Sequence, residues 1–141
     1  MSSSAIQYSE TRDLPLESVV ALYRANEWSS AEKPTLLHQA LLASHSLVTA
    51  WDGDTLAGLG NAISDGYLVV YYPHLLVLPA YQGRGIGQKL VTIMLEKLKK
   101  SYMIDLICDT SLQKFYKKLG MFPSSGMIKR NYPNQSGNKI C

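Results

Sequence analysis

The sequence has few cysteines and no long hydrophobic segment, and both absences narrow the class of protein. Its two cysteines, Cys108 and Cys141, are too few for a disulfide framework and favour a reducing compartment. The longest apolar run, residues 66–80, is interrupted by Pro73 and is too short to span a membrane. Residues 1–4 are polar and lack the features of a signal peptide. We therefore expect a cytoplasmic protein that does not bind a membrane.

A strong charge and a set of metal ligands are also missing. The formal net charge of the 141 residues is +3, which suits an anionic ligand but is too small to indicate nucleic-acid binding. His38 and His45 have no third ligand nearby, whereas zinc sites use three or four, so we expect no metal. The hydrophobic content of 46% predicts a folded chain, and the length predicts one domain over residues 1–141.

The hydrophobic pattern predicts a mixed α+β fold. Strands are expected at 6–10, 47–51, 55–63, 67–78, 103–108 and near Met127. Helices are expected to begin near Pro15 and at Pro34, and to span 86–101 and 112–119. Pro73 cannot donate a hydrogen bond to a neighbouring strand, so we expect an edge, a bulge or a splayed strand pair there.

The most informative segment is the glycine-rich sequence from Gln82 to Gly87, placed between a predicted strand and a predicted helix. Backbone N–H groups at such a helix start can bind a phosphate group. The segment lacks the Gly-Lys-Ser/Thr of an ATP-binding loop, and it fails the G-x-G-x-x-G spacing of dinucleotide-binding folds. The residues alone thus predict an anion site without naming the anion.

A wider pattern surrounds this segment: Leu76-Val77-Leu78-Pro79-Ala80-Tyr81 precedes it, and Phe115-Tyr116-Lys117-Lys118-Leu119-Gly120 follows about thirty residues later. This pattern resembles the GNAT superfamily of acetyl-CoA-dependent N-acetyltransferases, particularly small arylalkylamine-acetyltransferase-like members. The resemblance covers most of the chain. It implies a mostly antiparallel sheet flanked by helices, with a splayed central strand pair.

The resemblance also implies roles for individual residues. The residues implied to bind acetyl-CoA are Leu75, Leu76, Val77, Gln82, Gly83, Arg84, Gly85, Ile86, Gly87, Gln88, Asp109 and Tyr116. Tyr116 is implied to protonate or hold the departing thiolate, although its place on an apolar helix face also suits core packing. Relatives often have asparagine where this chain has Asp109, which could instead cap the following helix.

The group that removes a proton from the amine is less clear. Tyr71 stands where relatives often have glutamate or histidine, and tyrosine is not a base at neutral pH. His74 is the first candidate base and Asp65 the second, while structural roles in a strand and a turn stay open for both. A chain of water molecules without a dedicated base is a further alternative.

The acceptor pocket is expected around Trp28, Tyr67, Tyr71 and Tyr72, which could equally be ordinary strand or loop residues. The expected activity is direct transfer of acetyl from acetyl-CoA to a primary amine, and the amine is expected to belong to a small molecule rather than to a protein. The alternatives are a protein or peptide N-acetyltransferase and a non-catalytic CoA-binding regulatory module. A homodimer is compatible with the resemblance.

Overall fold

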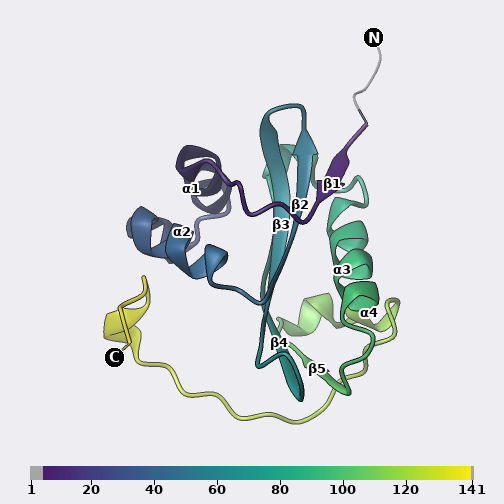
Figure 1. The fold of residues 1–141 in the computed structure, drawn as a ribbon. Helices are drawn as coiled ribbons and strands as arrows, with labels where there is room; N and C mark the ends of the chain where they lie inside the picture. The colour runs from purple at the N-terminus through teal and green to yellow at the C-terminus, as the bar shows by residue number, and fades with distance from the viewer. Residues whose placement is uncertain (1–4, 141) are drawn as a thin grey trace.

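The fold is built on one five-stranded sheet in the order β1-β2-β3-β4-β5 (Figure 1). The structure is a computed structural model, and it describes residues 5–140. The strands are β1 (Gln7–Ser9), β2 (Ser46–Asp52), β3 (Thr55–Ser64), β4 (Val69–Val77) and β5 (Met103–Asp105). The first four strands pair antiparallel, and β5 pairs parallel to β4. The sheet is therefore mixed and mostly antiparallel, as predicted.

Helices cover both faces of the sheet. They are α1 (Leu16–Ala25), α2 (Pro34–Leu42), α3 (Ile86–Lys97) and α4 (Gln113–Lys117). Short 3-10 turns lie at Ser29–Glu32, Pro79–Tyr81, Thr110–Leu112 and Tyr132–Asn134. Buried residues of α1 and α2 form one core with Leu47, Leu59 and Leu76 of the sheet. Residues of α3, with Tyr116 of α4, form the second core on the opposite face.

Strand β4 changes its facing at a bulge beside Pro73. Asn61 of β3 pairs with His74 and Ile63 pairs with Tyr71, so two β4 residues lie opposite the single residue Ala62. The extra residue reverses which side chains meet which core. Val70 and Tyr72 pack on the α3 side before the bulge, whereas His74 and Leu76 face α1 after it. Of the three alternatives expected at Pro73, an edge, a bulge or a splayed strand pair, the structure shows the bulge at this position.

The predicted elements differ most from the structure in three places. The strand predicted over 103–108 ends at Asp105, because its partner β4 continues past Tyr71 without pairing to it. The helix predicted over 86–101 ends at Lys97. The strand predicted near Met127 is wrong: residues 118–130 contain no helix or strand, because the segment pairs with none of the five strands of the sheet.

Candidate functional site

The parallel pairing of β4 with β5 ends after three residue pairs, the last of which is Tyr71 with Asp105. The rest of β4 remains paired only to β3. The Leu78 N–H donates to the carbonyl of Ala57 at 2.8 Å, which fixes the alternation of the preceding residues. By that alternation, the backbone groups of Leu75 and Val77 point to the side that β5 has left. This is the splayed pair expected from the sequence.

The exposed end of β4 is tied to its surroundings at Val77. The Val77 carbonyl accepts hydrogen bonds from the Asn26 side chain at 3.1 Å and from the Gln82 side chain at 3.2 Å. Asn26 also donates to the Leu22 carbonyl, so it joins the end of α1 to the end of β4. These bonds leave the N–H groups of Leu75 and Val77 as the donors directed into the splay.

The glycine-rich loop presents a row of backbone donors where α3 begins. Gly83 and Gly85 adopt φ of 78° and 79°, the left-handed conformation that favours glycine. Within residues 5–140, the N–H groups of 83–88 have no backbone or side-chain acceptor. Gly87 has ordinary helical geometry, and a methyl group there would meet the Phe115 and Val77 side chains at 3.8 Å. The loop therefore offers an anion site at a helix N-terminus.

A cation–π contact and a hydrogen bond hold the loop in place. The Arg84 guanidinium lies 5.1 Å from the centre of the Tyr81 ring, and the Tyr81 hydroxyl donates to Asp52 at 2.6 Å. This hydrogen bond raises the pKa of Tyr81. Asp52 lies at the end of β2, so the hairpin between β2 and β3 fixes the ring on which Arg84 rests.

Tyr116 lies on the α3 side of the splay. It is buried, it packs edge to face against Phe115 at 4.9 Å, and it belongs to the same core as Tyr72. Burial raises the pKa of Tyr116, and the neighbouring Cys108 raises it further. The phenol thus keeps its proton at neutral pH, as a proton donor must. Asp109 is exposed and makes no capping hydrogen bond to the turn that follows it.

His74 lies on the opposite face of β4, in a cluster with Tyr23 and Trp28. Its Nδ1 atom is 2.7 Å from the Tyr23 hydroxyl, and its ring packs edge to face against Trp28 at 4.9 Å. Burial lowers the pKa of His74 to about 4 and raises that of Tyr23. His74 is therefore a neutral imidazole at physiological pH. Its backbone N–H donates to the buried Asn61 side chain at 3.1 Å.

The remaining expected acceptor residues lie elsewhere. Tyr67 is in the turn between β3 and β4, and Tyr71 pairs with Ile63 at the same end of the sheet, where both side chains are exposed. The structure brings Trp28 and His74 together but gives neither a ring contact with these tyrosines. Asp65 accepts three backbone N–H bonds in the turn, which lower its pKa and account for its position.

Sequence reasoning missed three residues of this region: Tyr23, Asn26 and Asn61. No local pattern could have indicated these partners, because the bonds join residues that are 13 or 51 positions apart in sequence.

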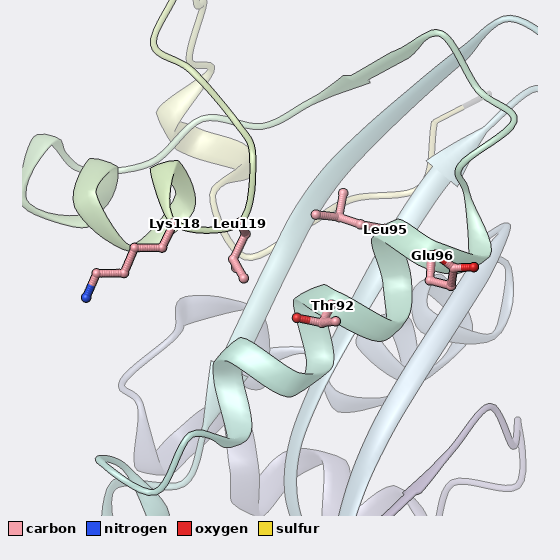
Figure 2. Close-up of a pocket in the computed structure, with 5 residues that line it drawn as sticks. All are labelled: Thr92, Leu95, Glu96, Lys118 and Leu119. Carbon is pink, nitrogen blue, oxygen red and sulfur yellow. The ribbon is translucent and has the colours of Figure 1, made fainter.

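A shallow hollow of about 440 Å³ lies between α3 and the end of α4 (Figure 2). Its lining residues are Thr92, Leu95, Glu96, Lys118 and Leu119. It adjoins the C-terminal half of α3, so it is separate from the glycine loop at the other end of that helix. None of the predicted site residues lines it.

Two other site types find no support in the part of the chain that the structure describes. No three histidine, cysteine or acidic side chains gather as a metal site among residues 5–140. None of the helices in that range is both long and apolar enough to cross a membrane.

Known proteins share this fold. Residues 10–121 match the acetyltransferase (GNAT) family. A GNAT-family acetyltransferase from Streptococcus pneumoniae is 32% identical, with a TM-score of 0.79 over 91% of this chain and 99% of that one. A proposed acetyltransferase from Deinococcus radiodurans is 30% identical, with a TM-score of 0.87 over 99% of this chain and 98% of that one.

An aminoglycoside N-acetyltransferase solved with CoA shares the fold at 17% identity, with a TM-score of 0.69 over 91% of this chain and 95% of that one. No curated protein sequence matches the chain. The family match spans far more than half of the residues, and it agrees with the splayed strands and the glycine loop. The chain therefore belongs to the GNAT family of acetyltransferases, which use acetyl-CoA.

Proposed function

We propose that the protein transfers an acetyl group from acetyl-CoA to the nitrogen of a primary amine, and that this amine is a small molecule. The observation that carries the proposal is the splay of β4 from β5, with an anion-binding loop at its mouth and a different polar side chain on each face. We also propose that residues 1–141 act as one domain and that it works in the cytoplasm.

The residues that would hold acetyl-CoA fit its chemistry. The free N–H groups of 83–88 suit a pyrophosphate, and Arg84 adds a positive charge beside them. The N–H groups of Leu75 and Val77 suit the amide and carbonyl oxygens of an extended acyl arm. Bound acetyl-CoA supplies the activated acetyl group, while the chain supplies the donors that hold and polarise it.

Tyr116 is proposed as the group that protonates or holds the thiolate as it leaves. Its phenol is neutral at physiological pH because burial raises its pKa. A tyrosine in that state can donate a hydrogen bond to sulfur without bringing a charge into the core. No covalent acetyl-enzyme is needed, because the amine attacks the acetyl carbon directly.

His74 is proposed to face the amine from the other side of β4. A neutral imidazole does not repel an approaching ammonium ion, and Trp28 beside it offers an aromatic surface. With a pKa of about 4, His74 is a weak base. It suits acceptance of a proton from an amine whose acidity rises as it attacks, directly or through water.

A thiol-release assay with a panel of amines tests the proposal. The panel includes arylalkylamines, aliphatic diamines, amino sugars and lysine-containing peptides, and mass spectrometry of each product checks for one added acetyl group. Release of CoA with small amines supports the proposal. Acetylation of peptides alone would assign the protein-directed alternative. Tight acetyl-CoA binding without turnover on any amine would indicate a binding module.

A further inference from the structure

The hydroxyl of Tyr72 is buried without a hydrogen-bond partner. Tyr72 is 3% exposed and packs in the α3-side core. Among the residues that the structure describes, its oxygen is the single buried side-chain polar atom that makes no hydrogen bond. The Tyr23 hydroxyl, by contrast, is hydrogen-bonded to His74. The Tyr81 hydroxyl donates to Asp52. A buried polar group in the state of Tyr72 needs a physical explanation.

Two features of the sequence lower stability while they keep this hydroxyl in the core. An unsatisfied buried hydroxyl destabilises a fold, whereas phenylalanine at position 72 would fill the same space without a polar atom. Gly60 lies against the hydroxyl in the middle of β3, where glycine weakens a strand, and a methyl group there would overlap the oxygen. Both features are explained if the hydroxyl takes part in the function.

Tyr72 stands where the splay begins. It follows Tyr71, the last residue of β4 that pairs with β5, and it precedes the bulge at Pro73. Tyr116, the proposed acid, lies in the same core. Burial raises the pKa of Tyr72, and the nearby Tyr116 raises it further. Because an ionised Tyr116 opposes the ionisation of Tyr72, Tyr72 keeps its proton when Tyr116 loses its own.

The other groups around Tyr116 do not favour negative charge on its oxygen. The α3 side chains of this core are all apolar: Ile86, Leu90, Val91 and Met94. Burial raises the pKa of Tyr116, and Cys108, which follows β5, raises it further. Lys114 and Lys117 of α4 are exposed. Tyr72 is therefore the buried hydroxyl donor that this core offers to Tyr116.

We propose that Tyr72 is a positioning residue for Tyr116: its unpartnered hydroxyl turns its proton toward the Tyr116 oxygen, directly or through one water molecule, as negative charge develops there. The hydrogen of a free hydroxyl can rotate about the C–O bond to do this. The inference rests on the proposed role of Tyr116 in acetyl transfer.

The proton transfer in that step explains why a second phenol helps. The amine nitrogen bonds to the acetyl carbon, the C–S bond breaks, and the thiolate sulfur takes the proton of Tyr116. The Tyr116 oxygen keeps the electron pair of its O–H bond until solvent returns a proton. A donor beside that oxygen stabilises the phenolate in a core of low polarity, so the proton leaves more easily.

Fluorine NMR measures this interaction without reference to acetyl transfer. A fluorinated tyrosine is placed at position 116, because its more acidic phenol titrates at a lower pH, where the protein stays folded. Tyr72→Phe is expected to raise the pKa of this phenol by about one pH unit, the roughly tenfold effect of one hydrogen bond. Cys108→Ala is expected to lower it. Tyr102→Phe, at an almost fully exposed position, is the control and should leave it unchanged.

The direction of the change separates a positioning role from a structural one. Looser packing would admit water to the core and lower the pKa of Tyr116, whereas loss of a donor raises it. An unchanged or lowered pKa in Tyr72→Phe would overturn the inference. Circular dichroism checks that each variant is folded, which is expected for Tyr72→Phe because phenylalanine keeps the ring and its packing.

Turnover gives a second readout with any amine that the protein acetylates. Tyr72→Phe is expected to lower kcat about tenfold, with the KM for acetyl-CoA unchanged. In the Tyr116→Phe background it should have no further effect. An equal loss in that background would overturn the inference, because Tyr72 would then act without Tyr116. Absence of turnover on every amine would contradict the proposed function, and the pKa measurement would still decide the role of Tyr72.

Discussion

Two side chains on opposite faces of β4, the buried Tyr116 and the partly buried His74, are kept neutral at physiological pH. Burial raises the pKa of Tyr116 on the α3 side, and burial lowers the pKa of His74 on the α1 side. The same cause acts in opposite directions because the charged form of tyrosine is its base and that of histidine is its acid. In the proposed reaction, each residue would therefore exchange a proton only with a partner whose acidity changes during the transfer.

Replacing Tyr116 with phenylalanine removes only the hydroxyl oxygen and so tests the proposed role of Tyr116 as the acid. Turnover is expected to fall by about 10²-fold, the lower end of general acid catalysis, because thiolates leave readily without help. The dissociation constant of acetyl-CoA, measured by calorimetry, is expected to stay the same, since the ring and its packing against Phe115 remain. Tyr102→Phe is the control, because Tyr102 is almost fully exposed. Unchanged turnover in Tyr116→Phe would exclude the acid role.

His74 predicts a dependence of stability on pH. Its pKa is about 4 when folded, against about 6.5 for an exposed histidine. Between these values the unfolded chain binds a proton that the folded chain does not. As far as His74 is concerned, the free energy of unfolding should therefore be highest above pH 6.5. It should fall as the pH drops towards 4, by at most about 3 kcal/mol.

Urea unfolding of the wild type and of His74→Gln at pH 7 and pH 4.5 measures how much His74 contributes to the loss of stability at low pH. The wild type is expected to lose more stability than the variant between the two pH values, because glutamine does not titrate. The exposed His45 supplies the control His45→Gln, which should lose as much as the wild type. Equal losses in all three proteins would contradict the assigned burial effect.

At the scale of elements, the pairing of β3 with β4 depends on one close contact. A methyl group at Gly60 would overlap the Tyr72 hydroxyl oxygen and would lie 2.9 Å from the ring carbon that bears it. The Tyr72 hydroxyl is itself buried and, among the described residues, has no hydrogen-bond partner. Glycine at position 60 thus leaves room for the Tyr72 hydroxyl, although this hydroxyl gains no hydrogen bond among the described residues.

Unfolding measurements on a double-mutant cycle test this contact. Gly60→Ala is expected to destabilise the protein by about 1–3 kcal/mol, as overpacked cores do. Tyr72→Phe is expected to be neutral or stabilising, because it removes an unpaired buried polar group. In the Tyr72→Phe background the cost of Gly60→Ala should shrink. Gly126→Ala, where a methyl group meets nothing within 4 Å, is the control. Additive effects would show that the two residues do not touch.

Elements that depend on local signals were predictable from the sequence. Pro34 begins α2, and Pro73 marks the bulge. The glycine loop also begins its helix at Ile86, as expected. The contact of His74 with Tyr23 was not predictable, because it requires the bulge to turn residue 74 toward α1, 51 positions away in sequence. The strand expected near Met127 failed for a related reason: residues with strand propensity form a strand only where a partner edge is available.

At the scale of the whole molecule, the sheet separates two cores, and the proposed ligand would contact residues that belong to both. Leu75 and Val77 pack against the α3-side core, while Asn26, directly after α1, donates to the Val77 carbonyl from the other side. Binding at the splay should therefore stabilise the entire fold rather than one segment. A ligand at one hundred times its dissociation constant adds about 2.7 kcal/mol to the free energy of unfolding.

Thermal unfolding with and without acetyl-CoA measures how much the ligand stabilises the fold. The variant Gly87→Ala tests whether the ligand binds at the start of α3. Without ligand, the variant should be at least as stable as the wild type, because its methyl group makes only ordinary contacts at 3.8 Å and alanine favours a helix by about 1 kcal/mol over glycine. With ligand at a fixed concentration, the rise in melting temperature should be smaller in Gly87→Ala, because the methyl group would stand between the helix start and the pyrophosphate. Gly126→Ala should show the full rise. An equal rise in Gly87→Ala and the wild type would mean that the anion binds away from this helix turn.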